Sequence, residues 1–98
     1  MFNNKSPEQQ QAYLLQWKAD AQMYNSEIVY MNSVIANKSK EVDSYRQTNP
    51  KLAVMLMSQV RLAKSQLNQI EQEKHSALMS WMSNNTILPS TLAIALTY

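Results

Sequence analysis

Apolar side chains recur through the first half of the chain in alternating steps of three and four residues. The positions are Leu14, Trp17, Ala21, Tyr24, Ile28, Met31, Ile35, Lys38, Val42 and Tyr45, of which only Lys38 is not apolar. This spacing is typical of a coiled-coil seam along one face of an α-helix. Ser6 can cap such a helix, Pro7 suits its first position, and Gln9 follows the cap as in a capping box. The sequence therefore predicts a helix over residues 7–47.

The pattern stops at Asn49-Pro50 and then resumes. A residue before proline is disfavoured in the helical region, whereas Thr48 or Asn49 can cap a new helix with Pro50 in its first turn. The second series is Ala53, Leu56, Val60, Ala63, Leu67, Ile70, Lys74, Ala77 and Trp81. It ends at Asn84-Asn85, which tolerate a left-handed turn. We predict a turn over 48–50 and a second helix over 50–84.

The break lies at the middle of the chain, which favours an antiparallel pair of helices. The predicted fold class is all-α, with a long antiparallel, coiled-coil-like helical hairpin in residues 1–85 and an apolar C-terminal docking tail in 86–98. A single helix kinked at Pro50 is the alternative, and an internal proline costs about 3 kcal/mol. In the antiparallel register Trp17 meets Trp81, and Lys74 comes within reach of Glu27.

The tail after Pro89 fits two kinds of secondary structure. Its larger apolar side chains alternate with smaller ones, which is typical of a half-buried strand, while Ser90 or Thr91 can cap a two-turn helix. The sequence does not decide between them. The tail either folds back near Trp17 and Trp81, exchanges into a neighbouring copy, or binds a partner by strand addition or in a groove. Folding back is the simplest of the three.

Further apolar side chains lie off both seams. In the first predicted helix they are Leu15, Met23, Val29, Tyr30 and Val34, and in the second the segment "LAVMLM" at 52–57 is apolar on every side. One partner helix cannot cover such a segment. We predict a four-helix bundle or larger helical homo-oligomer, with a Met-rich groove for another helical protein as the alternative. The predicted interaction residues are Leu52, Val54, Met55, Met57, Leu62, Leu78, Met82, Leu92, Ile94, Leu96 and Tyr98.

Charge modifies this picture in two ways. Lys38 and Lys74 interrupt the seams, and a lysine at such a position can set the register or the oligomeric state. The simpler interpretation is that the aliphatic part of each lysine lies along apolar surface while its ammonium group reaches water. Residues 38–64 contain six basic and two acidic side chains, against three basic and five acidic elsewhere. This basic segment is either a solvated tip, a surface that steers copies together, or one that attracts an acidic partner.

Composition argues against catalysis and cofactor binding. The chain has no Gly for a phosphate-binding loop, no Cys for thiolate metal ligands, and a single histidine, His75, outside any HExxH motif. We therefore expect no enzymatic activity, catalytic residue, metal, cofactor or small-molecule substrate. The net charge of +2 is small and the aromatic residues fall mostly on the seams, which argues against nucleic-acid binding. No segment has the apolar length of a transmembrane helix.

The Asn49-Pro50 turn and the amphipathic run from Leu52 to Trp81 resemble subunits of type III secretion needles and the small chaperones of those systems. Phage structural and scaffolding proteins share this plan. The first helix is longer than a needle subunit's should be and the tail extends further, so no family is assigned. The resemblance implies an assembly, scaffold or filament subunit, or a secretion-type chaperone.

The function that we predict is that of a non-enzymatic interaction protein which self-associates through its helices. The alternative is a small regulator or inhibitor that binds a larger protein or nucleic-acid complex. The start "MFNNKSPEQQQ" lacks the apolar core of a Sec-type signal peptide. This expectation is compatible with a cytoplasmic or virion-associated protein, or with export by a route that needs no signal peptide.

Overall fold

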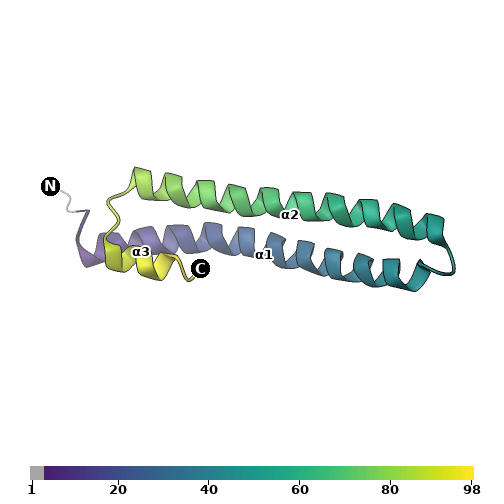
Figure 1. The fold of residues 1–98 in the computed structure, drawn as a ribbon. Helices are drawn as coiled ribbons and strands as arrows, with labels where there is room; N and C mark the ends of the chain where they lie inside the picture. Colours follow the sequence, from purple (N-terminus) through teal and green to yellow (C-terminus); the bar gives the residue numbers. More distant parts are fainter. Residues whose placement is uncertain (1–3) are drawn as a thin grey trace. The chain divides into compact units, whose positions relative to one another are not determined.

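Three α-helices make up the secondary structure of residues 4–98, the part of the chain that the computed structural model describes (Figure 1). α1 spans Pro7–Tyr45, α2 spans Pro50–Asn84, and α3 spans Pro89–Ala95. No strand occurs among these residues. The predicted all-α fold, with two long helices joined near the middle of the chain as a hairpin, is confirmed. α1 ends two residues earlier than the sequence predicted.

Side chains cap the helices at the predicted breaks. The hydroxyl oxygen of Ser6 accepts a hydrogen bond from the Gln9 amide at 3.2 Å, and the Asn49 side-chain oxygen accepts one from the Leu52 amide at 3.2 Å. Asn49 therefore caps α2, which satisfies one of the unpaired amides of its first turn. No described residue has a positive φ, so α2 does not end in the left-handed turn that Asn84-Asn85 would tolerate. Instead the Asn85 amide group donates to the Trp81 carbonyl at 2.9 Å.

The chain divides into two compact units, each of which contains part of α1 and part of α2. Unit 1 comprises Met1–Asn25 and Gln72–Tyr98, and it includes α3. Unit 2 comprises Ser26–Glu71 and includes the connection between α1 and α2. Unit 1 is thus built from three helical segments, whereas unit 2 is built from two.

Two indole rings form the centre of unit 1. Trp17 is 1% exposed, and its ring stacks on that of Trp81 with 5.8 Å between centroids and 29° between planes. Ala21 and Ala95 complete the buried cluster, and their small side chains leave room for the indoles. The predicted proximity of Trp17 and Trp81 is confirmed, which fixes the register of the antiparallel helices in this unit.

Unit 2 has a narrower core that follows the predicted seams. Its buried side chains are Val42, Ala53, Leu56 and Ala63. Within the "LAVMLM" segment only Ala53 and Leu56 are buried, while Val54, Met55 and Met57 remain exposed. Lys38, the seam lysine of α1, donates a hydrogen bond to the side-chain oxygen of Gln59 on α2 at 2.7 Å. Two helices therefore bury one seam each and leave the rest of this unit's apolar surface uncovered.

Candidate interaction surfaces

α3 packs against the tryptophan cluster of unit 1, so the tail folds back on its own chain as the simplest prediction had it. The Trp17 indole nitrogen donates to the Ala95 carbonyl at 3.1 Å, and Thr91 and Ala95, one helical turn apart, are both buried. Partly buried hydrophobic side chains surround this cluster: Tyr13, Leu14, Ala77, Leu78, Met82, Ile87 and Tyr98. The tail is a structural part of unit 1.

A buried glutamine holds the segment that leads into α3. Gln10 is 6% exposed, and its side-chain nitrogen donates to the main-chain oxygens of Thr86 at 2.7 Å and Asn4 at 2.6 Å. Its side-chain oxygen accepts a hydrogen bond from the Leu88 amide at 3.1 Å. Leu88 is the N-cap residue of α3 and makes no side-chain cap of its own. Gln10 thus pairs with main-chain groups of the irregular 85–88 connection that no helix bond satisfies.

The other end of the tail is held by α1 and α2 together. The main-chain oxygen of Tyr98 accepts hydrogen bonds from the Asn25 amide group at 2.5 Å and the Lys74 ammonium at 3.0 Å. Lys74 also donates to the Asn25 side-chain oxygen at 2.7 Å, and the Lys18 ammonium lies 5.6 Å from the centre of the Tyr98 ring. A cation beside the C-terminal end of a helix is favourable because the carbonyl groups there carry partial negative charge.

Two expectations for these segments need correction. Of the two structures that fit the tail, it adopts the helix, and the cap position of that helix is Leu88 rather than Ser90 or Thr91. Lys74 binds Asn25 and Tyr98 and forms no ion pair with Glu27 among the described residues. In both cases the tail supplies contacts that a two-helix register does not contain.

The predicted interaction residues separate into two groups. Leu78, Met82 and Tyr98 pack against the tryptophan cluster, Leu92 is partly buried within α3, and Ile94 and Leu96 are exposed. Those in unit 2 are largely open: Val54, Met55, Met57 and Leu62 are exposed and Leu52 is partly buried. The structure thus brings some of these residues into an internal core and leaves others on the surface.

One uncovered surface of unit 2 is apolar. Tyr30, Val34 and Leu62 line a shallow depression of about 380 Å³, together with Met31, Lys38, Gln59, Ala63 and Gln66. Tyr30 is 65% exposed and Leu62 is 60% exposed. Met55 precedes Leu62 by one heptad and so lies on the same face of α2, two turns earlier. We call Tyr30, Val34, Met55 and Leu62 the apolar flank.

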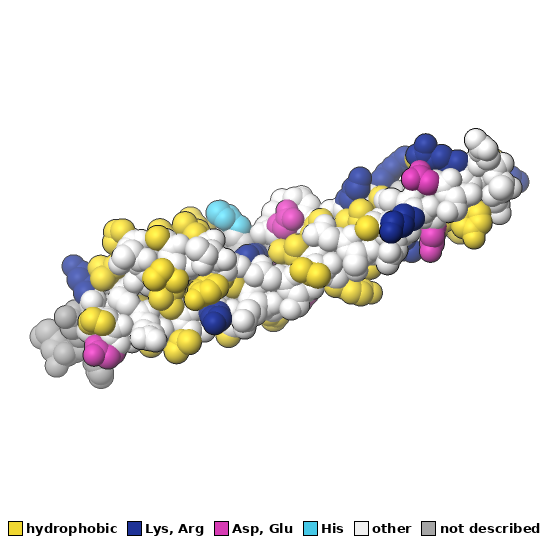
Figure 2. Space-filling model, turned by 90° about the horizontal axis from the view of Figure 1, so that it is seen from below, with side chains coloured by type: hydrophobic (Ala, Val, Ile, Leu, Met, Phe, Trp, Pro, Cys, Tyr) yellow, Lys and Arg dark blue, Asp and Glu magenta, His cyan; other side chains and the backbone are white. Residues whose placement is uncertain are grey.

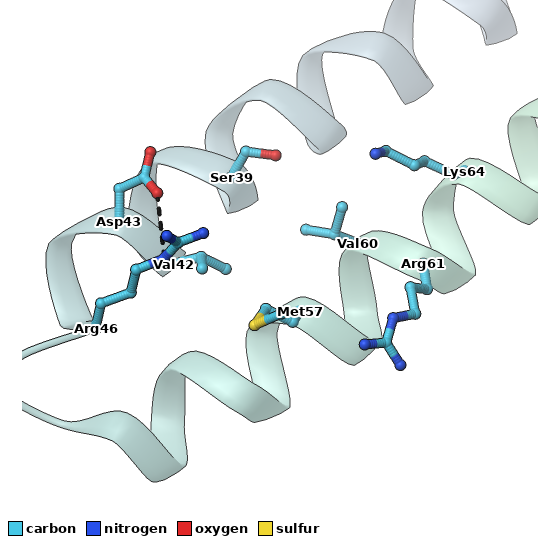
Figure 3. A pocket seen from close by; sticks show the side chains of 8 residues that line it. All are labelled: Ser39, Val42, Asp43, Arg46, Met57, Val60, Arg61 and Lys64. Atoms are coloured by element: carbon cyan, nitrogen blue, oxygen red, sulfur yellow. Dashed lines mark ion pairs between the residues drawn. The ribbon is translucent and has the colours of Figure 1, made fainter.

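A second surface of unit 2 is a groove with a basic rim, shown in Figure 3. α1 contributes Ser39, Val42, Asp43 and Arg46, and α2 contributes Met57, Val60, Arg61 and Lys64, around a volume of about 280 Å³. We call these eight residues the basic groove. The Arg46 guanidinium lies 3.6 Å from the Asp43 carboxylate, and both side chains are largely exposed. Figure 2 shows Lys and Arg side chains gathered where α1 and α2 are joined.

The apolar flank and the basic groove lie on different sides of unit 2. On α1, Val34 of the flank and Ser39 of the groove are separated by five residues, which is roughly 140° around a helix. The sequence marked Tyr30 and Val34 as apolar residues off the seam, and it marked the excess of basic residues over 38–64. Only the fold gathers Arg46, Arg61 and Lys64 over a shared apolar floor.

Side chains that could act as metal ligands do not gather within the described residues. His75 is exposed on α2, and no group of three or more His, Cys, Asp and Glu side chains forms within residues 4–98. The described helices also include none that combines the length and hydropathy needed to cross a membrane.

No known family model, curated protein or solved structure matches this chain. By its fold the chain is nevertheless an all-α hairpin protein, in which the C-terminal segment folds back as a third helix.

Proposed function

We propose that this chain is a non-enzymatic interaction protein that self-associates through the apolar flank of unit 2, as an assembly or scaffold subunit does. The observation that supports the proposal most directly is the exposure of Tyr30 and Leu62 beside the partly buried Val34. Exposed apolar residues are ordinary when scattered, but a contiguous set marks an interaction surface.

The contrast between the units strengthens this proposal. In unit 1 a third helix covers the tryptophan cluster, whereas unit 2 contributes only two helices to its own packing. A second pair of helices from another copy would bury the apolar flank in the manner of a four-helix bundle. Met55 and Val34 would then become core residues, and Met side chains adapt readily to irregular packing.

The test is the mass of the protein over a micromolar concentration series, measured by size-exclusion chromatography with light scattering. The wild-type protein is expected to exceed the mass of one chain, and Leu62→Glu is expected to weaken association at least tenfold. A tenfold change corresponds to about 1.4 kcal/mol. Loss of a buried leucine together with burial of an unpaired carboxylate costs more than that.

Val29→Glu is the matched control. Val29 is 68% exposed, lies in unit 2, and falls at the heptad position of Asp43 in the basic groove rather than on the apolar flank. It should leave the mass unchanged. A wild-type protein that stays monomeric through the whole series, or equal effects of the two variants, would contradict self-association through the apolar flank.

A further inference from the structure

We propose that the basic groove of unit 2 binds an amphipathic helix of a partner protein. This helix carries carboxylates beside its apolar side chains. This inference goes beyond self-association and concerns a different side of the unit. Its basis is an apolar floor, formed by Val42, Val60 and Met57, below a rim that carries three cations and one carboxylate. Figure 3 shows Val42 and Val60 between the two helices, with Lys64 directed across the groove toward α1.

Two of the three cations of the rim have no partner within the described residues. Among residues 4–98, neither the Arg61 guanidinium nor the Lys64 ammonium has a hydrogen-bond or ion-pair partner. The Arg46 guanidinium has only the exposed Asp43 carboxylate at 3.6 Å. Two unpaired cations therefore flank the apolar floor. A ligand that presents carboxylates beside apolar side chains would match both features of the groove at once.

The same sides of α1 and α2 lie beside the C-terminal tail and its cluster in unit 1. By heptad position, Ser39 and Arg46 on α1 correspond to Asn25, which binds the end of the tail in unit 1. On α2, Met57 and Lys64 correspond to Leu78, which packs against the cluster that α3 completes. In unit 1 these positions thus contact the end of the tail or the cluster that the tail completes, and in unit 2 they line an open groove. Because that tail contains the helix α3, we take a helix as the shape of ligand for this side of the helix pair.

Charge and composition select among the possible occupants. A second copy placed symmetrically on the groove would bring its own Arg46, Arg61 and Lys64 close to the same cations, which is unfavourable. A nucleic-acid strand would match the charge, but the groove contains no aromatic side chain on which a base could stack, and its apolar floor would face phosphates. The carboxylates of an acidic amphipathic helix would pair with the cations of the rim, and its apolar side chains would pack on the floor.

The experiment measures fluorescence anisotropy of a labelled helical peptide of about 18 residues, long enough to be helical in isolation. The peptide carries Leu on one face and Glu beside it, and a second peptide carries Lys in place of each Glu. The wild-type protein should bind the Glu peptide at least tenfold more tightly than the Lys peptide. The double variant Arg61→Gln/Lys64→Gln should weaken binding of the Glu peptide about tenfold, and Met57→Asp should weaken it further.

Lys40→Gln/Lys51→Gln is the matched control, because it removes the same charge from exposed positions outside the groove. It should change binding less than twofold. Circular dichroism of each variant should match the wild type, and measurements on a Leu62→Glu background separate this site from self-association. The proposal is overturned if the control weakens binding as much as the groove variant. It is equally overturned if the Lys peptide binds as well, or if a single-stranded oligonucleotide binds more tightly and loses affinity in the groove variant.

Discussion

Replacement of Trp17 by phenylalanine tests whether α3 and the indole pair hold unit 1 together. Trp17 is 1% exposed, its ring stacks on Trp81, and its nitrogen donates to the Ala95 carbonyl at 3.1 Å. Trp17→Phe keeps an aromatic ring in the core but removes that donor and part of the buried surface. The variant therefore separates the contribution of the larger indole from that of aromatic packing in general.

The magnitude follows from these contacts. Removing the carbons of the five-membered ring that phenylalanine lacks costs about 2 kcal/mol, at about 0.8 kcal/mol for each buried methylene-sized group and with a small cavity left behind. Loss of the hydrogen bond adds about 1 kcal/mol, at the lower end of the range because the Ala95 carbonyl keeps the Tyr98 amide as a donor. Trp17→Phe should therefore lower the free energy of unfolding by about 3 kcal/mol. A domain of this size has roughly 5–15 kcal/mol in total.

The assay is urea unfolding followed by far-UV circular dichroism and by the fluorescence of Trp81, at the lowest workable protein concentration so that association does not contribute. Leu15→Ala is the control, because Leu15 is 61% exposed although it lies two residues from Trp17. It should change the free energy of unfolding by no more than about 0.5 kcal/mol. A loss below about 1 kcal/mol for Trp17→Phe would refute the view that α3 is anchored through this indole.

Two further predictions concern the polar contacts of the tail. Gln10→Leu should lower the free energy of unfolding by about 2 kcal/mol in the same assay, because it leaves the Thr86 carbonyl and the Leu88 amide without their partner. The exposed Gln11→Leu should have almost no effect, and equal effects would contradict the role of Gln10. Lys74→Met should speed amide hydrogen exchange at Thr97 and Tyr98 about tenfold by NMR. Lys40→Met should not, since Lys74 is the lysine that donates to the Tyr98 main-chain oxygen. Unchanged exchange in Lys74→Met would show that the tail end is held by other contacts.

The two long helices could be predicted from sequence because their signals are local and repeated. Alternating steps of three and four residues define each seam, and the antiparallel register that brought Trp17 to Trp81 follows from a break at the middle of the chain. Asn49 sits next to Pro50, so cap and helix start are read from neighbouring residues. Each of these inferences needs only residues that are close in sequence or that a single reversal of the chain brings together.

The tail and its anchors could not be predicted in this way. Every residue from Leu92 to Leu96 is apolar, so a strand period and a helix period fit equally well. The burial of Thr91 and Ala95, which lie one helical turn apart in the unit that contains Trp17, favours the helix over the strand. Gln10 gives no local signal either, because the Thr86 carbonyl that it binds is 76 residues away in sequence.

The basic groove shows a related limit. An excess of positive charge over residues 38–64 is visible in the sequence, but the excess alone does not separate a solvated tip from a binding site. That distinction depends on which cations lie unpaired beside an apolar floor, and the floor is formed jointly by Val42 on α1 and Val60 on α2. Only the pairing of the two helices within unit 2 supplies this information.

The two proposed surfaces of unit 2 are compatible with each other. The apolar flank includes Tyr30 and Leu62, the basic groove includes Arg61 and Lys64, and the neighbours Arg61 and Leu62 point about 100° apart on α2 because each residue advances a helix by that angle. A second copy on the flank would therefore leave the groove open to an acidic helix. It follows that self-association would increase the number of grooves in one particle, and a partner that carries several acidic helices would bind the assembly more tightly than a single chain.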